Sequence, residues 1–124
     1  MKTLNEYRKS SDLPKLLFEA RQKAHNDHLA SKSYAEHKAL DSFYTALLDL
    51  ADDFIETYQG QYGLIDPPKT LETPEGNTIQ FLENFASQLK SAHKNMKDDT
   101  HLQNIVDEIV ALTYRTIYKL KNLK

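Results

Sequence analysis

Residues 33–60 decide the fold; they read SYAEHKALDSFYTALLDLADDFIETYQG. Apolar side chains recur there every three or four residues, which places them on one face of an α-helix. Ser33 followed by Glu36 is a capping box that predicts the start of this helix, and Gly60 predicts its end. The apolar positions are Leu40, Phe43, Leu47, Leu50, Phe54 and Tyr58. We therefore expect one long amphipathic helix over residues 33–60.

Three further helices are predicted around this one. Asp12 and Pro14 suit the start of a helix that continues to about residue 29. Residues 78–96 carry a narrow apolar stripe at helical spacing. A last helix begins at residue 100, where Thr100 and Gln103 form a second capping box.

The connection over residues 61–77 sets the predicted topology. It holds three of the four prolines in the chain and is therefore irregular. At about 3.3 Å per residue it can reach along the whole length of a bundle. We therefore expect a four-helix bundle with one long crossover between the second and third helices, the arrangement of ferritin-like folds.

The composition fits one globular domain. The chain has 124 residues, of which 40% are hydrophobic and 27% charged. It has 16 basic and 18 acidic residues, so no overall positive field draws it onto nucleic acid or anionic lipid. It has no cysteine, and no run approaches the roughly 18 apolar residues of a membrane span. We expect a flexible N-terminal arm over residues 1–11, a bundle over residues 12–124, no membrane partner and a cytoplasmic location.

One stripe of the 33–60 helix carries side chains that can bind metals. At about 100° per residue, with His37 as zero, Asp41 lies at about 40°, Asp52 at about 60° and Glu56 at about 100°. The first two residues and the last two form pairs that lie about 16 Å apart along the axis, too far for one metal ion. If two copies of the helix pack antiparallel about a two-fold axis near Leu48, each pair of one copy faces the other pair of its mate.

The end of the preceding helix supplies further imidazoles. Residues 24–30 read AHNDHLA, and the short link that follows brings His25 or His28 beside His37 and Asp41. Two imidazoles and three carboxylates suit iron, with manganese or zinc as alternatives. Solvated surface charges are the competing interpretation, because a histidine and an aspartate four residues apart occur on many helix faces.

The spacing of these residues resembles a known signature. His25, eleven residues, His37, three residues, Asp41, ten residues, Asp52, three residues and Glu56 are similar to the ferroxidase motif of the Dps miniferritins, the DNA-binding proteins from starved cells. The resemblance implies a ferritin-like bundle assembled through two-fold dimers into a hollow dodecamer. It also implies that these five residues are metal ligands and catalytic residues of a ferroxidase, an oxidoreductase that oxidises ferrous iron for iron storage and protection from oxidative stress.

The sequence also departs from that family. Asn26 stands where many members carry tryptophan, and the unusual connection over residues 61–77 makes a dimer or another small assembly an alternative to the dodecamer. DNA binding has weak support from the terminal cations Lys2, Arg8, Lys9, Lys119, Lys121 and Lys124. The alternative function is a non-catalytic dimeric helical scaffold or partner-binding protein of miniferritin descent, in which the five residues are vestigial or structural.

Overall fold

The computed structural model describes the backbone of residues 4–124 and the side chains of residues 13–124. Over this part of the chain it contains four α-helices and no strand, so the predicted all-α class is confirmed. The helices are α1 (Leu4–Ala30), α2 (Tyr34–Tyr62), α3 (Thr78–Lys94) and α4 (Thr100–Asn122). Among these described helices, none has both the length and the apolar character needed to span a membrane.

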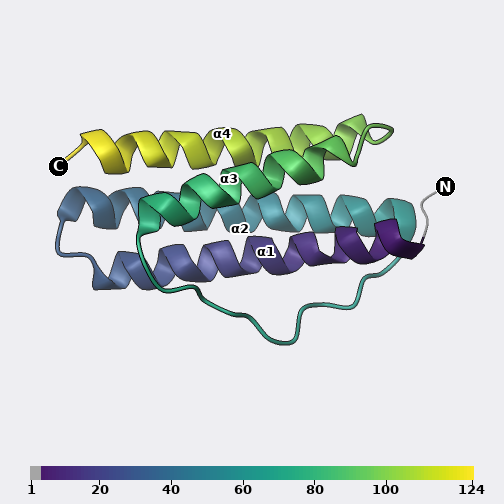
Figure 1. The fold of residues 1–124 in the computed structure, drawn as a ribbon, viewed down its shortest axis with the longest axis horizontal. Coiled ribbons are helices and arrows are strands. Elements are labelled where there is room, and N and C mark those ends of the chain that lie inside the picture. The colour runs from purple at the N-terminus through teal and green to yellow at the C-terminus, as the bar shows by residue number, and fades with distance from the viewer. Residues whose placement is uncertain (1–3) are drawn as a thin grey trace.

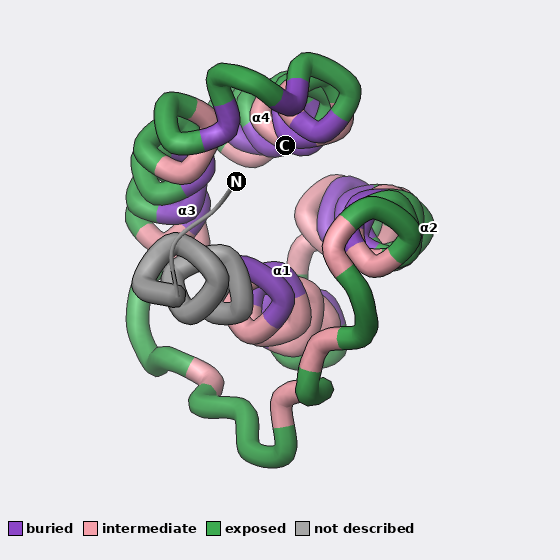
Figure 2. Tube along the Cα trace, turned by 90° about the vertical axis from the view of Figure 1, so that its right-hand side faces the viewer, coloured by how far each residue is buried: buried purple, intermediate pink, exposed green. Residues whose placement is uncertain are grey.

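The four helices form a bundle in which each helix packs against two others (Figure 1 and Figure 2). α1 and α4 each contact α2 and α3, so α1 and α4 lie on one diagonal and α2 and α3 on the other. Figure 1 shows that helices in contact run in opposite directions. The four-helix bundle is therefore an antiparallel one.

The core lies between the apolar faces of all four helices. Phe43 of α2 and Phe85 of α3 meet across the diagonal with their ring centroids 6.4 Å apart and nearly perpendicular, a favourable aromatic arrangement. Each fully buried side chain of this size stabilises the fold by about 1.5–3 kcal/mol. The largest apolar side chains that are completely buried are Leu17, Leu40, Phe43, Leu47, Phe54, Leu82, Phe85, Leu89, Leu102, Val106 and Ile109. The apolar stripe that predicted α2 is thus the stripe that it buries.

α1 is longer than the sequence suggested. It begins at Leu4 and passes through Pro14, so most of the segment expected to be an arm, residues 1–11, is helical in its backbone. Pro14 lacks an N–H and so removes one hydrogen bond from the helix, which a long helix can tolerate when its apolar face is packed. Residues 1–3 of the expected arm lie outside the described residues.

α2 ends two residues beyond Gly60. Its C-cap is Gly63, which has φ = 100° and donates its N–H to the carbonyl of Gln59 at 2.9 Å. A positive φ is strained for any residue with a Cβ atom, whereas a glycine inside a helix costs only about 1 kcal/mol. The helix therefore continues through Gly60 and ends at the glycine whose conformation requires it.

The two predicted capping boxes have different outcomes. Ser33 is the N-cap of α2, and its hydroxyl accepts the N–H of Glu36 at 3.3 Å. The predicted capping box of Thr100 and Gln103 is wrong. The N-cap of α4 is Asp99, and its side chain makes no capping hydrogen bond. The buried carboxylate of Asp99 instead accepts hydrogen bonds from the Gln61 amide at 2.8 Å and the Tyr62 hydroxyl at 2.5 Å. Tertiary partners at the end of α2 thus replace the local cap.

The connection between α2 and α3, residues 63–77, has no helix or strand and runs along the outside of α1 (Figure 1). Two hydrogen bonds attach it to that helix. The N–H of Glu72 donates to the Glu19 carboxylate at 2.5 Å, and Lys23 Nζ donates to the carbonyl of Gly76 at 2.8 Å. The connection is therefore held against the bundle at its middle and at its end.

Candidate functional site

The structure divides the five expected metal ligands between two environments. His25 of α1 and His37 and Asp41 of α2 are half-buried where these two helices pack together. Asp52 and Glu56 are exposed, further along α2. No group of three or more His, Asp or Glu side chains in the described part of one chain is arranged to hold a metal ion. The described residues of one chain therefore form no metal site by themselves.

His28, which the sequence analysis kept only as an alternative ligand, is a central residue of this region. It is buried, and its ring stacks on that of His37 with centroids 3.7 Å apart and planes 22° apart. His28 Nδ1 donates to the carbonyl oxygen of His37 at 2.8 Å, and His37 Nδ1 donates to the carbonyl oxygen of His28 at 2.9 Å. Because a carbonyl oxygen only accepts, both Nδ1 atoms must carry a proton. The two imidazoles therefore join the end of α1 to the start of α2.

His25 is held in a second aromatic stack. Its ring lies on that of Tyr44 with centroids 4.4 Å apart and planes 17° apart, and the Arg21 guanidinium lies 5.9 Å from the same tyrosine ring. Burial raises the pKa of Tyr44, and the hydrogen bond from its hydroxyl to Asp41 raises it further. The hydroxyl therefore stays protonated at neutral pH and donates to Asp41.

These contacts explain why α2 carries polar residues beside its apolar face. His37 and Tyr44 stack on side chains of α1, and helical spacing places Asp41 and Leu48 on the same side of α2. A flank of this kind must meet a neighbouring element, and here the neighbour is another helix of the same chain. Packing within the chain thus accounts for the part of the stripe that the sequence analysis assigned to a dimer. Asp52 and Glu56 lie beyond this contact.

A second polar cluster was not found from the sequence. Lys23 is only 4% exposed, and its Nζ lies 3.1 Å from the Asp27 carboxylate in addition to its bond with Gly76. The same carboxylate oxygen, Asp27 Oδ2, also accepts a hydrogen bond from the Thr78 hydroxyl at 2.6 Å. Lys23 and Asp27 are one helical turn apart, a spacing common on exposed helices, so the sequence held no signal that this pair is buried.

Comparison with known proteins gives the chain a family. Residues 28–120 match the model described as "Family of unknown function (DUF5856)". The chain belongs to this family. This DUF5856 protein is 33% identical over 107 residues to a protein of Enterobacteria phage T4 described as "Uncharacterized 14.6 kDa protein in mobD-ri intergenic region". The match covers 85% of this chain and 82% of the phage protein, and no solved structure matches.

The family match overturns the resemblance to the Dps miniferritins. Dps or ferritin-like descent is wrong, so the assignment as a ferroxidase and iron-storage protein loses the resemblance on which it rested. The spacing from His25 to Glu56 resembles the miniferritin motif for another reason. The histidines at the end of α1 and the polar side chains on one side of α2 pack against each other where the two helices meet. Binding of iron, manganese or zinc by side chains from two copies stays a prediction from the sequence.

Proposed function

We propose that this protein is a non-catalytic helical scaffold that binds a second copy of itself through the outer surface of α1 and α2. The observation that carries the proposal is a cluster at the α1–α2 contact, which we name the α1–α2 patch and define as Arg21, His25, Asp41, Tyr44 and Leu48. Tyrosine and arginine are enriched among the residues that dominate protein interfaces. The proposal keeps the cytoplasmic location expected from the sequence.

Leu48 provides the apolar centre of this patch. It is 37% exposed, one helical turn beyond Tyr44, whereas the neighbouring Leu47 is fully buried in the core. Burial of the exposed part of a leucine in both copies of a two-fold interface would favour association. α2 is a straight rod of 29 residues, about 43 Å long, and offers a long surface for such a contact.

The charges of the two helices suit an antiparallel arrangement. Arg21 Nε is buried and has no hydrogen-bond partner among the described residues. Asp52 and Glu56 are exposed further along α2. A two-fold axis near Leu48 would bring these carboxylates level with the cationic and imidazole side chains of Arg21 and His25 in the second copy. Self-association through this surface would therefore pair opposite charges.

The connection over residues 63–77 has a part in this proposal. It would act as a fixed crossover that lets α3 start at the same end of the bundle as α2. The bonds from Glu72 to Glu19 and from Lys23 to Gly76 support a connection that stays on α1. Because Glu19 and Lys23, to which it is bonded, lie on the other side of α1 from Arg21 and His25, it would leave the α1–α2 patch open for a second copy.

Size-exclusion chromatography with light scattering tests the proposal. We expect the wild-type protein to form a two-fold dimer or a larger assembly built from such dimers. Leu48→Arg should weaken the dimer by about tenfold or more in Kd, because each of the two copies loses the burial of the exposed third of Leu48, which is worth roughly 0.5–1 kcal/mol, and places a charge at the centre of the interface. Leu48→Met should keep the dimer, since it conserves volume.

Leu64→Arg is the matched control. Leu64 is 89% exposed in the connection between α2 and α3, so the same substitution there changes charge without touching the patch. A wild-type protein that stays monomeric at high concentration would overturn the proposal. A dimer that Leu48→Arg leaves intact would overturn the assignment of the interface to this surface.

A further inference from the structure

The opposite side of the bundle carries a segregated positive charge. Residues 84–97, from α3 and the turn that follows, and residues 109–124, from α4 and the chain end, contain no aspartate or glutamate. The chain as a whole nevertheless has more acidic than basic residues, 18 against 16. The cations of these two segments are Lys90, Lys94, Lys97, Arg115, Lys119, Lys121 and Lys124. We name this surface the α3–α4 basic face.

The two segments lie side by side, so their charges add on one surface. α3 packs antiparallel against α4, and Lys90 Nζ donates to the Tyr114 hydroxyl at 2.6 Å. Two carboxylates lie on this side of the bundle, Glu83, 3.8 Å from Lys121 Nζ, and Asp107, 3.0 Å from His93 Nε2, and the cations Lys90 and Arg115 lie between them along the helices. All of the named cations except the half-buried Lys119 are exposed.

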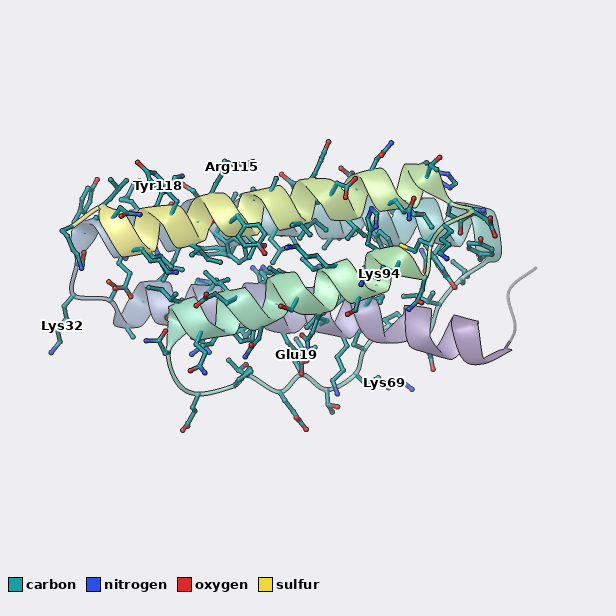
Figure 3. All side chains as sticks on the ribbon, turned by 45° about the horizontal axis from the view of Figure 1, so that its top comes forward. Glu19, Lys32, Lys69, Lys94, Arg115 and Tyr118 are labelled. Carbon is teal, nitrogen blue, oxygen red and sulfur yellow. The ribbon has the colours of Figure 1, made fainter. Side chains whose placement is uncertain are left out.

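Two tyrosines project from the same face. Tyr114 is 45% exposed and Tyr118 is 58% exposed, one helical turn apart on α4. Figure 3 shows Tyr118 and Arg115 extending from α4 away from the bundle, while Lys94 extends from α3. Lys90 Nζ lies 4.7 Å from the ring centre of Tyr114, so this tyrosine is already part of a cation–π contact. The ring of Tyr118 is the more accessible of the two.

We propose that the α3–α4 basic face binds single-stranded nucleic acid. Lysine and arginine side chains would pair with the phosphates, and the exposed tyrosine rings would stack on unpaired bases, the combination by which proteins hold single strands without reading their sequence. A duplex keeps the faces of its bases stacked inside, so it would offer the two tyrosine rings nothing to stack on. This inference is independent of the proposed self-association, which uses the opposite surface.

Fluorescence anisotropy with a labelled oligothymidylate of about 16 nucleotides, the upper end of common site sizes, tests the inference. We expect the wild-type protein to bind it at low salt and to lose affinity as salt rises. Arg115→Ala should weaken binding and reduce the slope of log K against log salt by about 0.7, the value for one phosphate contact on a single strand. Tyr118→Ala should weaken binding about fivefold or more without changing that slope, whereas Tyr118→Phe should bind like the wild type.

Lys69→Ala is the control for charge, because Lys69 lies on the connection, on the far side of the bundle from Arg115 (Figure 3). The inference is overturned if the oligonucleotide does not bind at low salt, or if Arg115→Ala and Tyr118→Ala bind like Lys69→Ala. It is also overturned if a duplex of equal length binds as tightly and Tyr118→Ala has no effect. A fall in assembly mass with Arg115→Ala, without nucleic-acid binding, would instead assign the face to a second copy of the chain.

Discussion

We expect Lys23 to contribute more than any other residue to holding the connection against α1. Lys23→Ala should lower the free energy of unfolding by about 2 kcal/mol, because it leaves the Asp27 carboxylate and the Gly76 carbonyl without their buried donor. Urea denaturation followed by circular dichroism measures the change. Lys38→Ala, at an exposed position of α2, is the control and should stay within about 0.5 kcal/mol of the wild type. Equal effects of the two substitutions would show that the buried contact adds no stability.

The histidines show what could be predicted for single residues. The sequence predicted that the end of α1 returns to the start of α2 and brings His25 or His28 beside His37; in the structure His28 is the one that stacks on His37, and His25 stacks on Tyr44. It could not show which ring would stack on which partner, because helical spacing fixes only the direction of a side chain around its own axis. Their hydrogen bonds to backbone carbonyls depend on the geometry of the turn between the helices. The sequence therefore predicted which residues lie close together at the candidate site, but not the stacking and hydrogen bonds that they make there.

At the scale of an element, the two glycines near the end of α2 give opposite predictions. Gly60→Ala should stabilise the protein by about 0.5–1 kcal/mol, since Gly60 is helical and a Cβ atom there would meet nothing within 4 Å. Gly63→Ala should destabilise it by about 1–3 kcal/mol, because Gly63 has φ = 100° although its surroundings are equally open. Thermal and urea unfolding of both variants measure the difference. Shifts of the same sign would contradict the placement of the helix end at Gly63.

The helices themselves were predictable to different degrees. α2 was found nearly complete, because its apolar stripe is strong and Ser33 caps it as expected. The start of α1 was not, because residues 4–11 lack the apolar periodicity that identifies a helix and Pro14 resembles a start signal. The start of α4 was one residue off in its cap, since Asp99 bonds to Gln61 and Tyr62 of α2, far away in the sequence. Local signals therefore gave the existence of each helix, and distant contacts decided its ends.

At the scale of the whole molecule, the bundle followed from four apolar faces that must be buried together. The order of helices around it did not follow from the sequence alone. α2 lies beside α1 and α4, so the polar flank of α2 is covered by α1 within one chain. The sequence analysis had placed His37, Asp41, Asp52 and Glu56 at a two-fold interface, with His25 or His28 of the preceding helix beside the first pair. The surface left for a second copy consists of the exposed Leu48, Asp52 and Glu56 and the solvent-facing parts of the half-buried Arg21, His25, Asp41 and Tyr44.

Ferrous iron distinguishes the scaffold from the abandoned ferroxidase assignment. We expect the wild-type protein to leave the rate of ferrous oxidation in air at the rate of buffer alone. The His28–His37 pair uses both Nδ1 atoms to join two helices, and the exposed Asp52 lies about 16 Å along α2 from Asp41. Absorbance of the ferric product, measured on protein whose assembly mass is known, gives the rate.

Asp52→Asn and the matched Glu75→Gln, on the connection between α2 and α3, complete the experiment. Each substitution removes one exposed carboxylate. Under the scaffold proposal, ferrous iron should be oxidised at the rate of buffer alone in the presence of either variant. Oxidation above buffer that Asp52→Asn removes and Glu75→Gln retains would mean that carboxylates from a second copy do complete a metal site at His25, His37 and Asp41. In that case the dimer would be needed to form the metal site, and Leu48→Arg should abolish both the dimer and the oxidation of iron.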